Sequence, residues 1–253
     1  FEITPASHSE SPVLRKMIRF HFGQDPELVG RCYDFVADRG LDSAETKTML
    51  LDEYNVRPVI DTRLLWNVEK KDPAYDPSQP IIRPLFPDRK DSIFFSEKGT
   101  VHCVCPVTEE RRNMVYQGFE ADRKSIKFRC PAAACGIECA GKALCHAAGN
   151  VNSGSFGRTI RVPINKDRRI FMPTPHGTKS WDETYNRRSS LERINSRLDN
   201  SFGFEFHFIR GIAKMKTRVG LALAVMMAMA LGHVREQRLD QMRSLVKPIP
   251  KSA

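Results

Sequence analysis

Residues 33–61, YDFVADRGLDSAETKTMLLDEYNVRPVID, decide the fold class of this chain. Two compact apolar runs within it, 33–37 and 56–60, have the length of buried strands, and an aspartate follows each run directly. Between them, the tetrapeptide that begins at Asp42 has capping-box spacing and predicts a helix that reaches about Tyr54. A strand, a helix and a second strand in this order indicate a parallel α/β layer.

The chain carries a surplus of positive charge. Its 253 residues include 40 Lys and Arg against 30 Asp and Glu, which gives a net charge of +10. Residues 187–218 hold half of that surplus, a net +5. This balance favours a polyanionic partner, of which nucleic acid is the commonest, although a diffuse basic surface can also serve solubility alone.

Several classes of protein are excluded by what the sequence lacks. It contains no GxSxG motif and no Cys–His pair in a recognisable setting, which sets aside serine hydrolases and cysteine proteases. His102 and His176 show no metal-ligand spacing. The longest apolar run, 219–231, is shorter than the roughly 20 residues of a membrane span and predicts a buried helix. With no secretion signal at its start, the chain is expected to be cytoplasmic and to have no membrane partner.

The rest of the chain divides into three predicted parts. Residues 1–66 form the first part of an α/β core, which is incomplete at its start. Residues 67–178 comprise a linker with five prolines between positions 73 and 87 and a β-rich insertion. Residues 179–253 return to helix and complete the core. Further strands are expected at 1–4, 92–95, 100–105, 125–128, 159–162 and 169–172, and helices at 11–20, 206–212 and 214–235.

A second informative stretch is YNRRSSLERINSRLD at residues 185–199. Read as one helix, it places Tyr185, Arg188, Glu192 and Asp199 on a continuous polar stripe. Leu191, Ile194 and Leu198 form an apolar stripe that can face a core. Such a helix would hold a proton-handling or metal-binding carboxylate beside a phosphate-reading arginine. The alternative is a solvated face of an amphipathic helix.

Asp38 is the first candidate for chemistry. It lies at the carboxyl end of a predicted buried strand and directly before Arg39-Gly40, a position where α/β sheets gather ligands. Two converging carboxylates there would hold Mg²⁺, which prefers oxygen ligands. The alternative is that Asp38 only caps the turn. Asp61, at the end of the next strand, is a weaker rival, and Asp42 is expected to be a surface or capping residue.

Six of the seven cysteines form the second candidate site. A zinc site and buried free thiols are the two alternatives, since structural disulfides are not expected without a secretion signal. Cys135 and Cys139 would share one helix face, whereas no CxxC knuckle occurs. The six candidates are Cys103, Cys105, Cys130, Cys135, Cys139 and Cys145.

Four motifs, taken in order, resemble those of bacterial insertion-sequence DDE transposases. Tyr185-x2-Arg188-x3-Glu192 is similar to the Y-x2-R-x3-E signature of that family. Residues 38–43, DRGLDS, resemble its "aDrGYdS" motif. Residues 3–7 resemble its "vTpAs" strand end, and residues 210–214 its "rGl.k" segment. The cysteine-bearing insertion is similar to that of one branch of the family.

The resemblance implies an RNase H-like fold, a mixed sheet with flanking helices that a β-rich insertion interrupts. It implies strand cleavage and joining at transposon ends, with Asp38 as the second aspartate and Glu192 as the glutamate that hold two Mg²⁺ ions. Double-stranded DNA is then the partner, a homodimer forms on it, and the protein is nucleoid-associated. The residues expected to contact DNA are Tyr185, Arg188, Arg193 and Arg197.

Three departures from the family pattern bear on activity. The family's first aspartate precedes the segment with which this chain starts, Asp199 replaces a lysine, and Leu41 replaces a tyrosine. Because a two-metal site needs a bridging carboxylate, we expect the chain as given to be inactive or nearly so. The alternatives are a non-catalytic DNA-binding remnant and an unrelated zinc-containing nucleic-acid-binding protein.

Overall fold

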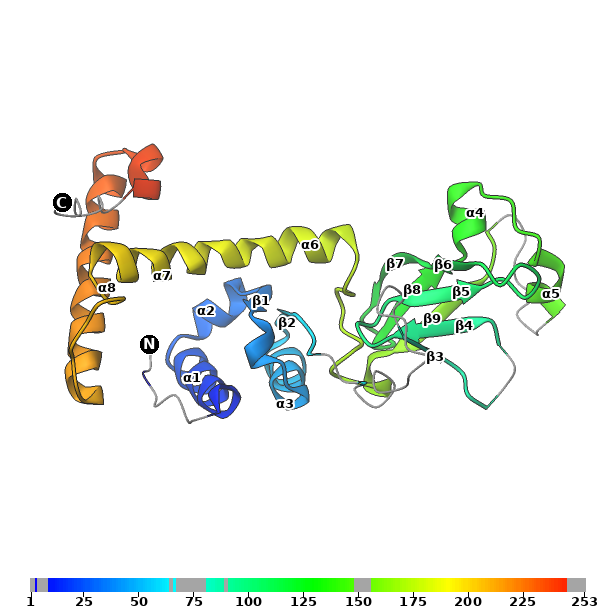
Figure 1. The fold of residues 1–253 in the computed structure, drawn as a ribbon, viewed down its shortest axis with the longest axis horizontal. Helices are drawn as coiled ribbons and strands as arrows, with labels where there is room; N and C mark the ends of the chain where they lie inside the picture. Colours follow the sequence, from blue (N-terminus) through cyan, green and yellow to red (C-terminus); the bar gives the residue numbers. More distant parts are fainter. Residues whose placement is uncertain are drawn as a thin grey trace. The chain divides into compact units, whose positions relative to one another are not determined.

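A computed structural model describes residues 3, 9–63, 66, 81–88, 91–147 and 156–244 (Figure 1). It is a mixed α/β structure with three separate sheets. Its contacts group the chain into two compact units, which we name the sheet unit (Leu14–Asn186) and the helical unit (Phe1–Val13 with Arg187–Ala253). The strand predicted over residues 1–4 and most of the proline-rich linker lie outside the described residues.

The parallel layer predicted from residues 33–61 is present in the sheet unit. Strands β1 (Asp34–Ala37) and β2 (Arg57–Ile60) pair in parallel, with Ala37 opposite Ile60 (Figure 1). The chain between them forms the 3-10 turn η1 (Arg39–Leu41), helix α3 (Ala44–Thr48) and the π-helical turn η2 (Met49–Glu53). The predicted helix start is found, but the cap is Ser43 and not Asp42, since the Ser43 hydroxyl accepts a hydrogen bond from the Thr46 amide at 3.0 Å.

One hydrophobic core lies around this layer. Helices α1 (Glu10–Gln24) and α2 (Pro26–Arg31) precede β1, and α1 buries Ile18 and Phe22. These side chains pack with apolar residues of β1, η2 and β2, and the Phe22 ring meets that of Tyr54 edge to face at 4.9 Å. Leu50, Val56 and Val59 are fully buried. The apolar pattern of residues 33–60 therefore positions the ends of both strands.

Asp42 is buried, which corrects the expectation of a surface or capping residue. Its carboxylate forms an ion pair with the Lys47 ammonium at 2.7 Å, and neither side chain is more than 1% exposed. It also accepts hydrogen bonds from the Arg63 amide at 2.9 Å and the Arg169 guanidinium at 3.0 Å. The Lys47 ammonium donates a second bond to the Arg169 carbonyl at 2.7 Å. Burial lowers the pKa of Lys47, against the attraction of Asp42. A charged network thus joins the α/β layer to the part of the chain around Arg169.

Two antiparallel sheets follow in the sheet unit. The first contains β3 (Ile82–Pro84), β4 (Ile93–Ser96), β5 (Val101–Val104) and β6 (Arg111–Asn113), and the second β7 (Val115–Glu120), β8 (Ser125–Arg129) and β9 (Thr159–Pro163). The sheets share one apolar core, to which β4, β5, β8 and β9 all contribute. Four predicted strands match β4, β5, β8 and β9. The strand predicted at 169–172 is wrong, because the chain after η4 (Ile164–Lys166) forms a turn over residues 168–170 and continues without regular structure through 171–172, where Phe171 is buried in the core.

Three short helices complete the sheet unit. Helix α4 (Pro131–Cys135) ends at Gly136, whose φ is +67°, so Cys139 lies beyond the helix and the predicted shared face of Cys135 and Cys139 is wrong. Helix α5 (Lys142–Ala147) follows. Helix α6 (Lys179–Tyr185) is capped by Thr178, whose hydroxyl accepts a hydrogen bond from the Trp181 amide at 3.3 Å. It packs against both β1 and β2.

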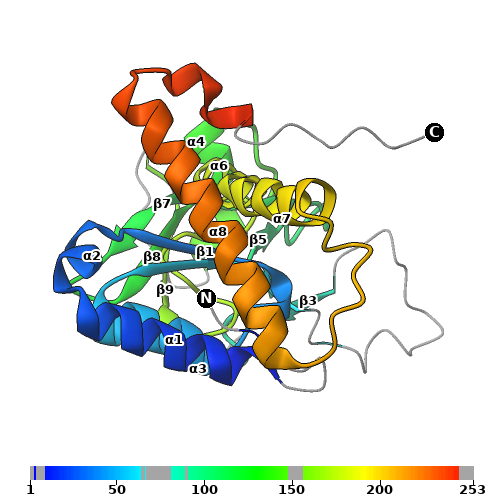
Figure 2. The same ribbon diagram turned by 90° about the vertical axis from the view of Figure 1, so that its left-hand side faces the viewer.

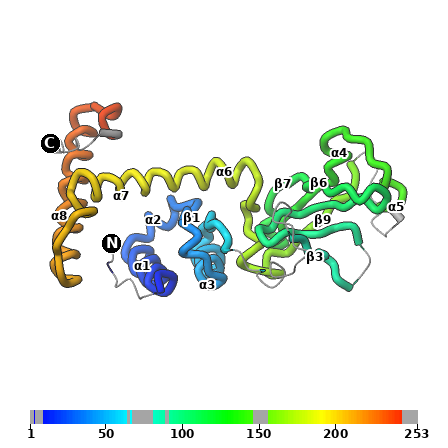
Figure 3. The backbone as a smooth tube through the Cα atoms, viewed as in Figure 1, coloured from blue at the N-terminus to red at the C-terminus, as the bar shows by residue number. Residues whose placement is uncertain are grey.

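The helical unit contains α7 (Ser189–Ser201), α8 (Ile212–Arg235) and the turn η6 (Leu239–Ser244), and α8 runs across α7 (Figures 2 and 3). No helix covers residues 206–211, so that prediction is wrong. Helix α8 confirms the predicted helix at 214–235 but not its burial, since only Ala222 and Met226 are buried. By length and composition it is the one described helix that could cross a membrane, with a mean hydropathy of 1.5, a test that core helices also pass.

Candidate functional site

Asp38 and Asp61 lie at the same edge of the parallel layer, because each directly follows one of two strands that end in register. Asp38 is exposed, and its carboxylate accepts a hydrogen bond from the Arg39 amide at 2.8 Å, which caps η1. The capping role predicted as an alternative for Asp38 is therefore present. An exposed carboxylate with further lone pairs can still accept other ligands.

Asp61 is a buried carboxylate surrounded by donors. It accepts hydrogen bonds from Arg39 Nε at 2.8 Å and Nη2 at 2.5 Å, and from the Thr62 amide at 2.9 Å. Burial raises the pKa of Asp61, but the hydrogen bond from Arg39 and the charge of Lys98 outweigh it, so the pKa lies below its usual value. This ionised carboxylate orients Arg39 beside Asp38 and has little capacity left for a metal ion.

Three aromatic rings stack beside Asp61. His176 Nε2 lies 3.3 Å from Asp61 Oδ1, and the His176 ring lies 4.0 Å from that of Trp181 between centroids. Trp181 in turn stacks on Tyr185, at 4.4 Å and an interplanar angle of 16°. Burial lowers the pKa of His176, with Lys98 acting in the same direction and Asp61 against it. No local pattern pointed to His176 as a partner of Asp61, because the two residues lie 115 positions apart in the chain.

Tyr185 lies at the end of α6, which packs against β1 and β2. The hydrogen bonds that Arg39 donates to Asp61 raise the pKa of Arg39, and the phenol of Tyr185 adds a smaller effect. Residues of two motifs that are far apart in the sequence, DRGLDS and the Tyr185 signature, therefore meet at one edge of β1 and β2. The edge combines an exposed carboxylate, an oriented guanidinium and a half-buried phenol.

The helix predicted over residues 185–199 is interrupted. The 3-10 turn η5 (Asn186–Arg188) separates α6 from α7, so Tyr185 belongs to the sheet unit and Glu192 to the helical unit. Arg188 and Glu192 form the expected i,i+4 contact, with Nη1 and Oε1 2.8 Å apart. The expected apolar face does not reach a core, because α7 contains no buried residue and Leu191 is 58% exposed.

The other predicted DNA-contacting residues lie on α7. Arg193 is exposed and its guanidinium bonds to the Ser189 carbonyl at 3.3 Å, whereas Arg197 donates to the Met242 carbonyl of η6 at 3.4 Å. Asp199 is exposed near the end of the same helix. The helical unit thus presents basic side chains along α7, and the acidic side chain of Asp199 lies on the same helix.

Within the described part of the chain, no three His, Cys, Asp or Glu side chains are grouped so that they could hold a metal ion. Asp38 fits a magnesium site as an exposed oxygen ligand, and Glu192 fits as an exposed carboxylate on a regular helix. Asp61 does not fit, since Arg39, Thr62 and His176 surround it. Of the described residues at this edge, Asp38 is the one whose carboxylate fits a magnesium ligand.

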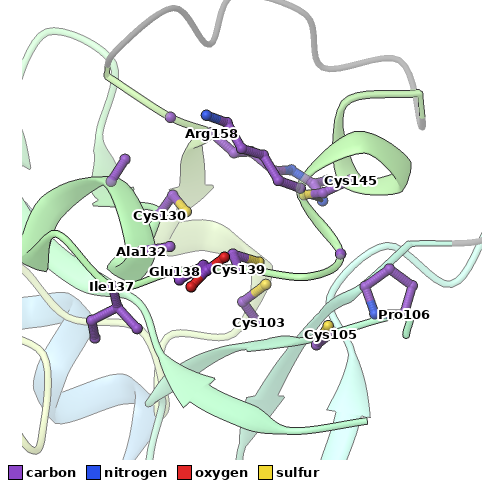
Figure 4. A pocket seen from close by; sticks show the side chains of 14 residues that line it. Cys103, Cys105, Pro106, Cys130, Ala132, Ile137, Glu138, Cys139, Cys145 and Arg158 are labelled. Atoms are coloured by element: carbon purple, nitrogen blue, oxygen red, sulfur yellow. Dashed lines mark hydrogen bonds between the residues drawn. The ribbon is translucent and has the colours of Figure 1, made fainter. Parts of the chain in front are cut away.

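A second site lies in the β-rich part, where a pocket of about 390 Å³ is lined by five of the six candidate cysteines (Figure 4). One lies on β5, one directly after β5 and one directly after β8. Another lies in the loop between α4 and α5, and the last lies on α5. Cys135 is exposed and is not among them. All the cysteines are free thiols. The lining thiols are those of Cys103, Cys105, Cys130, Cys139 and Cys145.

Two of these thiols have pKa values shifted in opposite directions. The neighbouring Cys103 and the nearby Arg158 together lower the pKa of Cys145 to about 5, against burial. The neighbouring Cys145, with burial, raises the pKa of Cys103. Arg158 Nη1 lies 3.8 Å from Cys145 Sγ, and its Nη2 donates to both carboxylate oxygens of Asp91 at 2.6 and 2.7 Å. A buried cation therefore stands beside this cluster of thiols.

Comparison with protein-family models, with curated proteins and with solved structures finds no match for this chain.

Proposed function

We propose that this chain is part of a DDE transposase with an RNase H-like core, and that it acts on double-stranded DNA. Asp38 and Glu192 would be two of its magnesium ligands. The magnesium ions would activate a nucleophile and stabilise the leaving oxygen during phosphodiester cleavage and joining. Whether the chain as given carries out catalysis depends on a further carboxylate ligand.

The observation that carries this proposal is the packing of α6, which ends at Tyr185, against β1 and β2, the two strands that Asp38 and Asp61 follow. Arg39 and Tyr185 belong to motifs 146 positions apart, and chance resemblance would not require those motifs to be neighbours in space. Carboxyl ends of parallel strands are where α/β sheets bind ligands. An exposed Asp38 at this edge is consistent with a metal ligand there.

The chain's own groups have distinct proposed roles. Asp61 holds the Arg39 guanidinium through two hydrogen bonds, so that Arg39 is a positioned cation beside Asp38. Tyr185, held by its stack on Trp181, presents a phenol to the same edge. Arg193, exposed on α7, supplies positive charge to a DNA phosphate. These are binding and positioning roles that do not depend on catalysis.

Metal-directed backbone cleavage tests the carboxylate assignment. Fe²⁺ bound at an oxygen-ligand site, with ascorbate and peroxide, generates radicals that cut nearby backbone. We expect cuts close to both residue 38 and residue 192 that excess Mg²⁺ suppresses, and the loss of both cuts in Asp38→Asn. The matched control is Asp25→Asn, an exposed capping aspartate of α2, which should keep the pattern. Cuts at neither position, or an unchanged pattern in Asp38→Asn, would overturn the magnesium assignment.

DNA binding is measured separately, because a non-catalytic remnant would keep it. We expect log Kd for a random duplex to depend linearly on log salt, with a slope that falls by about 0.9 for each phosphate contact removed. Arg193→Gln should lower the slope, whereas Lys16→Gln, an exposed lysine of α1, should not. DNA binding without iron-directed cleavage would support a non-catalytic DNA-binding remnant. DNA binding that is insensitive to salt would contradict both the transposase and the remnant.

The charge reversal at position 199 gives a sharper test of α7. If α7 faces DNA, Asp199→Lys should tighten binding several-fold by removing a repulsion and adding a phosphate contact. Asp240→Lys, an exposed aspartate of η6 in the same unit, controls for net charge. Equal gains in the two variants would show that only overall charge matters and would argue against α7 as the contact surface.

A further inference from the structure

The cysteine pocket collects thiols from distant parts of the β-rich region. Cys103 lies on β5, Cys130 directly follows β8, Cys139 lies between α4 and α5, and Cys145 lies on α5. Figure 4 shows these side chains around one cavity, with Arg158 at its rim. Free cysteines are often buried singly as small apolar residues, but packing alone gives no reason for several segments to converge on one point.

The thiols line one cavity together. The side chains of Cys103, Cys130, Cys139 and Cys145 all contribute to its wall, and Arg158 Nη1 lies 3.8 Å from Cys145 Sγ. Cys105 also lines the cavity, and its sulfur accepts a hydrogen bond from the Thr108 amide at 3.5 Å within the β5–β6 turn. Because Cys105 already has a hydrogen-bond donor in the turn, the other four thiols are the candidate ligands.

Two glycines allow the surrounding loops to approach these sulfurs. A Cβ on Gly141 would lie 2.9 Å from Cys105 Sγ, and one on Gly157 would lie 3.0 Å from Cys130 Cβ. Gly157 also has φ of +72°, which other residues rarely adopt. Both positions therefore require glycine so that the chain can close over the cysteines.

The segment that carries Cys139 and Cys145 has a weak apolar anchor. Pro131 is buried, but none of residues 131–145, whose side chains the structure describes, belongs to the hydrophobic core of the two sheets, and Ile137 and Leu144 are 46% and 55% exposed. Helices as short as α4 and α5 are not stable by themselves in water. A segment of this kind needs a cross-link or a metal ion to hold it on the sheets.

A buried hydrogen-bond donor lies beside the thiols. Arg158, 2% exposed, pairs with Asp91, and its Nη1 lies 3.8 Å from Cys145 Sγ. A Zn²⁺ ion with four thiolates carries a net charge of about −2, and hydrogen bonds to thiolate sulfurs stabilise such charge. The Arg158–Asp91 pair is neutral overall, so it supplies this donor and no net positive charge.

We propose that Cys103, Cys130, Cys139 and Cys145 bind one structural Zn²⁺ ion that fixes the segment from α4 to α5 on the two sheets. The thiols are not closed around a single point in the described residues, so binding must draw them to a Zn–S distance of about 2.3 Å. Rotation of the cysteine side chains and movement of the short Cys139 loop would bring this about. The proposal is independent of the DNA chemistry proposed above.

Metal analysis and cobalt substitution of the full chain test the proposal. Protein purified without chelator should contain one zinc per chain, and Co²⁺ exchanged for it should show the visible bands of a tetrahedral ion and the intense near-ultraviolet bands of four thiolates. This readout uses the unmodified protein and does not depend on whether variants fold. Cobalt spectra with fewer than three thiolates, or no stoichiometric metal, would overturn it.

Variants then identify the ligands. Cys130→Ser and Cys139→Ser should each lower zinc retention in the presence of a competing chelator at least tenfold. Cys135→Ser and Cys32→Ser, at an exposed and a separate position, should leave it unchanged. If Cys103 and Cys145 instead form a disulfide, the denatured metal-free protein will show five reactive thiols rather than seven, and the zinc assignment fails.

Discussion

The buried ion pair of Asp42 and Lys47 offers the sharpest test of how the sheet unit is held together. Lys47→Met keeps most of the volume of the side chain but removes the 2.7 Å ion pair and the 2.7 Å bond to the Arg169 carbonyl. Removal of one partner from a buried pair costs about 3–5 kcal/mol, because the other charge stays in the interior. Asp42 keeps its bonds from Arg63 and Arg169, so we expect the lower end, about 3 kcal/mol.

The reverse substitution should cost more. In Asp42→Leu, the Lys47 ammonium stays buried with only one carbonyl acceptor and with the Arg169 guanidinium nearby, so we expect about 5 kcal/mol. In the double variant Asp42→Leu/Lys47→Met both buried charges are gone and the cost should fall well below the sum of the single costs. Arg169, 31% exposed, can then turn toward solvent.

Tryptophan fluorescence provides the assay, followed during urea unfolding for the m-value and during heating for the thermal midpoint. The chain has two tryptophans, Trp66 and Trp181, and both belong to the sheet unit, so the signal reports this unit. Lys47→Met should lower the thermal midpoint by about 6–12 °C for a unit of this size, without a change in m-value. Lys179→Met is the control, because that lysine side chain is 90% exposed and should change stability by less than about 0.5 kcal/mol. A Lys47→Met loss below about 1 kcal/mol, or additive costs in the double variant, would refute the reasoning.

Two further perturbations concern His176 and Gly99. The pKa of His176 is lowered in the folded state, so its unfolded form takes up a proton near pH 6.5 before the folded form does, and stability should fall as pH drops from about 7 to 5, by at most about 1.4 kcal/mol per pH unit. His176→Gln should flatten that fall in pH-dependent unfolding curves, and identical slopes would contradict the burial argument. Gly99→Ala should cost about 2 kcal/mol or more, because φ is +82° and the new Cβ would lie 2.6 Å from the Ile170 carbonyl oxygen. Gly23→Ala in α1, where the Cβ meets nothing within 4 Å, should instead stabilise by about 0.5–1 kcal/mol, and equal effects at the two sites would exclude the strain explanation.

Local patterns in the sequence predicted the parallel layer well. The apolar runs around residues 33–37 and 56–60 and the helix start near Asp42 are signals carried by neighbouring residues, and the structure confirms them, with the cap one residue later, at Ser43. Asp38 was placed at a strand end for the same reason. Strands β6 and β7 were missed because Arg111–Asn113 and Val115–Glu120 are only partly buried and lack a clean alternation of apolar residues.

Features that depend on distant contacts could not be predicted. Asp42 resembles a surface residue until Lys47 and Arg169 enclose it, and Arg169 lies 127 positions away. His176 is held in place by its contacts with the Asp61 carboxylate and the Trp181 ring, which come from distant parts of the sequence or from another element. The apolar 169–172 segment resembles a strand because its side chains are buried, but the turn that precedes Phe171 supplies no strand partner. In each case the deciding interaction lies outside the local window.

The division of the chain into two units has a consequence for synthesis on the ribosome. Leu14–Asn186 is contiguous, so the sheet unit can fold as soon as these residues have emerged. The helical unit combines Phe1–Val13 with Arg187–Ala253, so it can form only after the segment from Arg187 onward has also been made. During that interval the nascent chain already displays Asp38 at the edge of β1 and β2, whereas α7 has not yet been completed. Residues Phe1–Val13 therefore wait for their partner segment while the sheet unit folds.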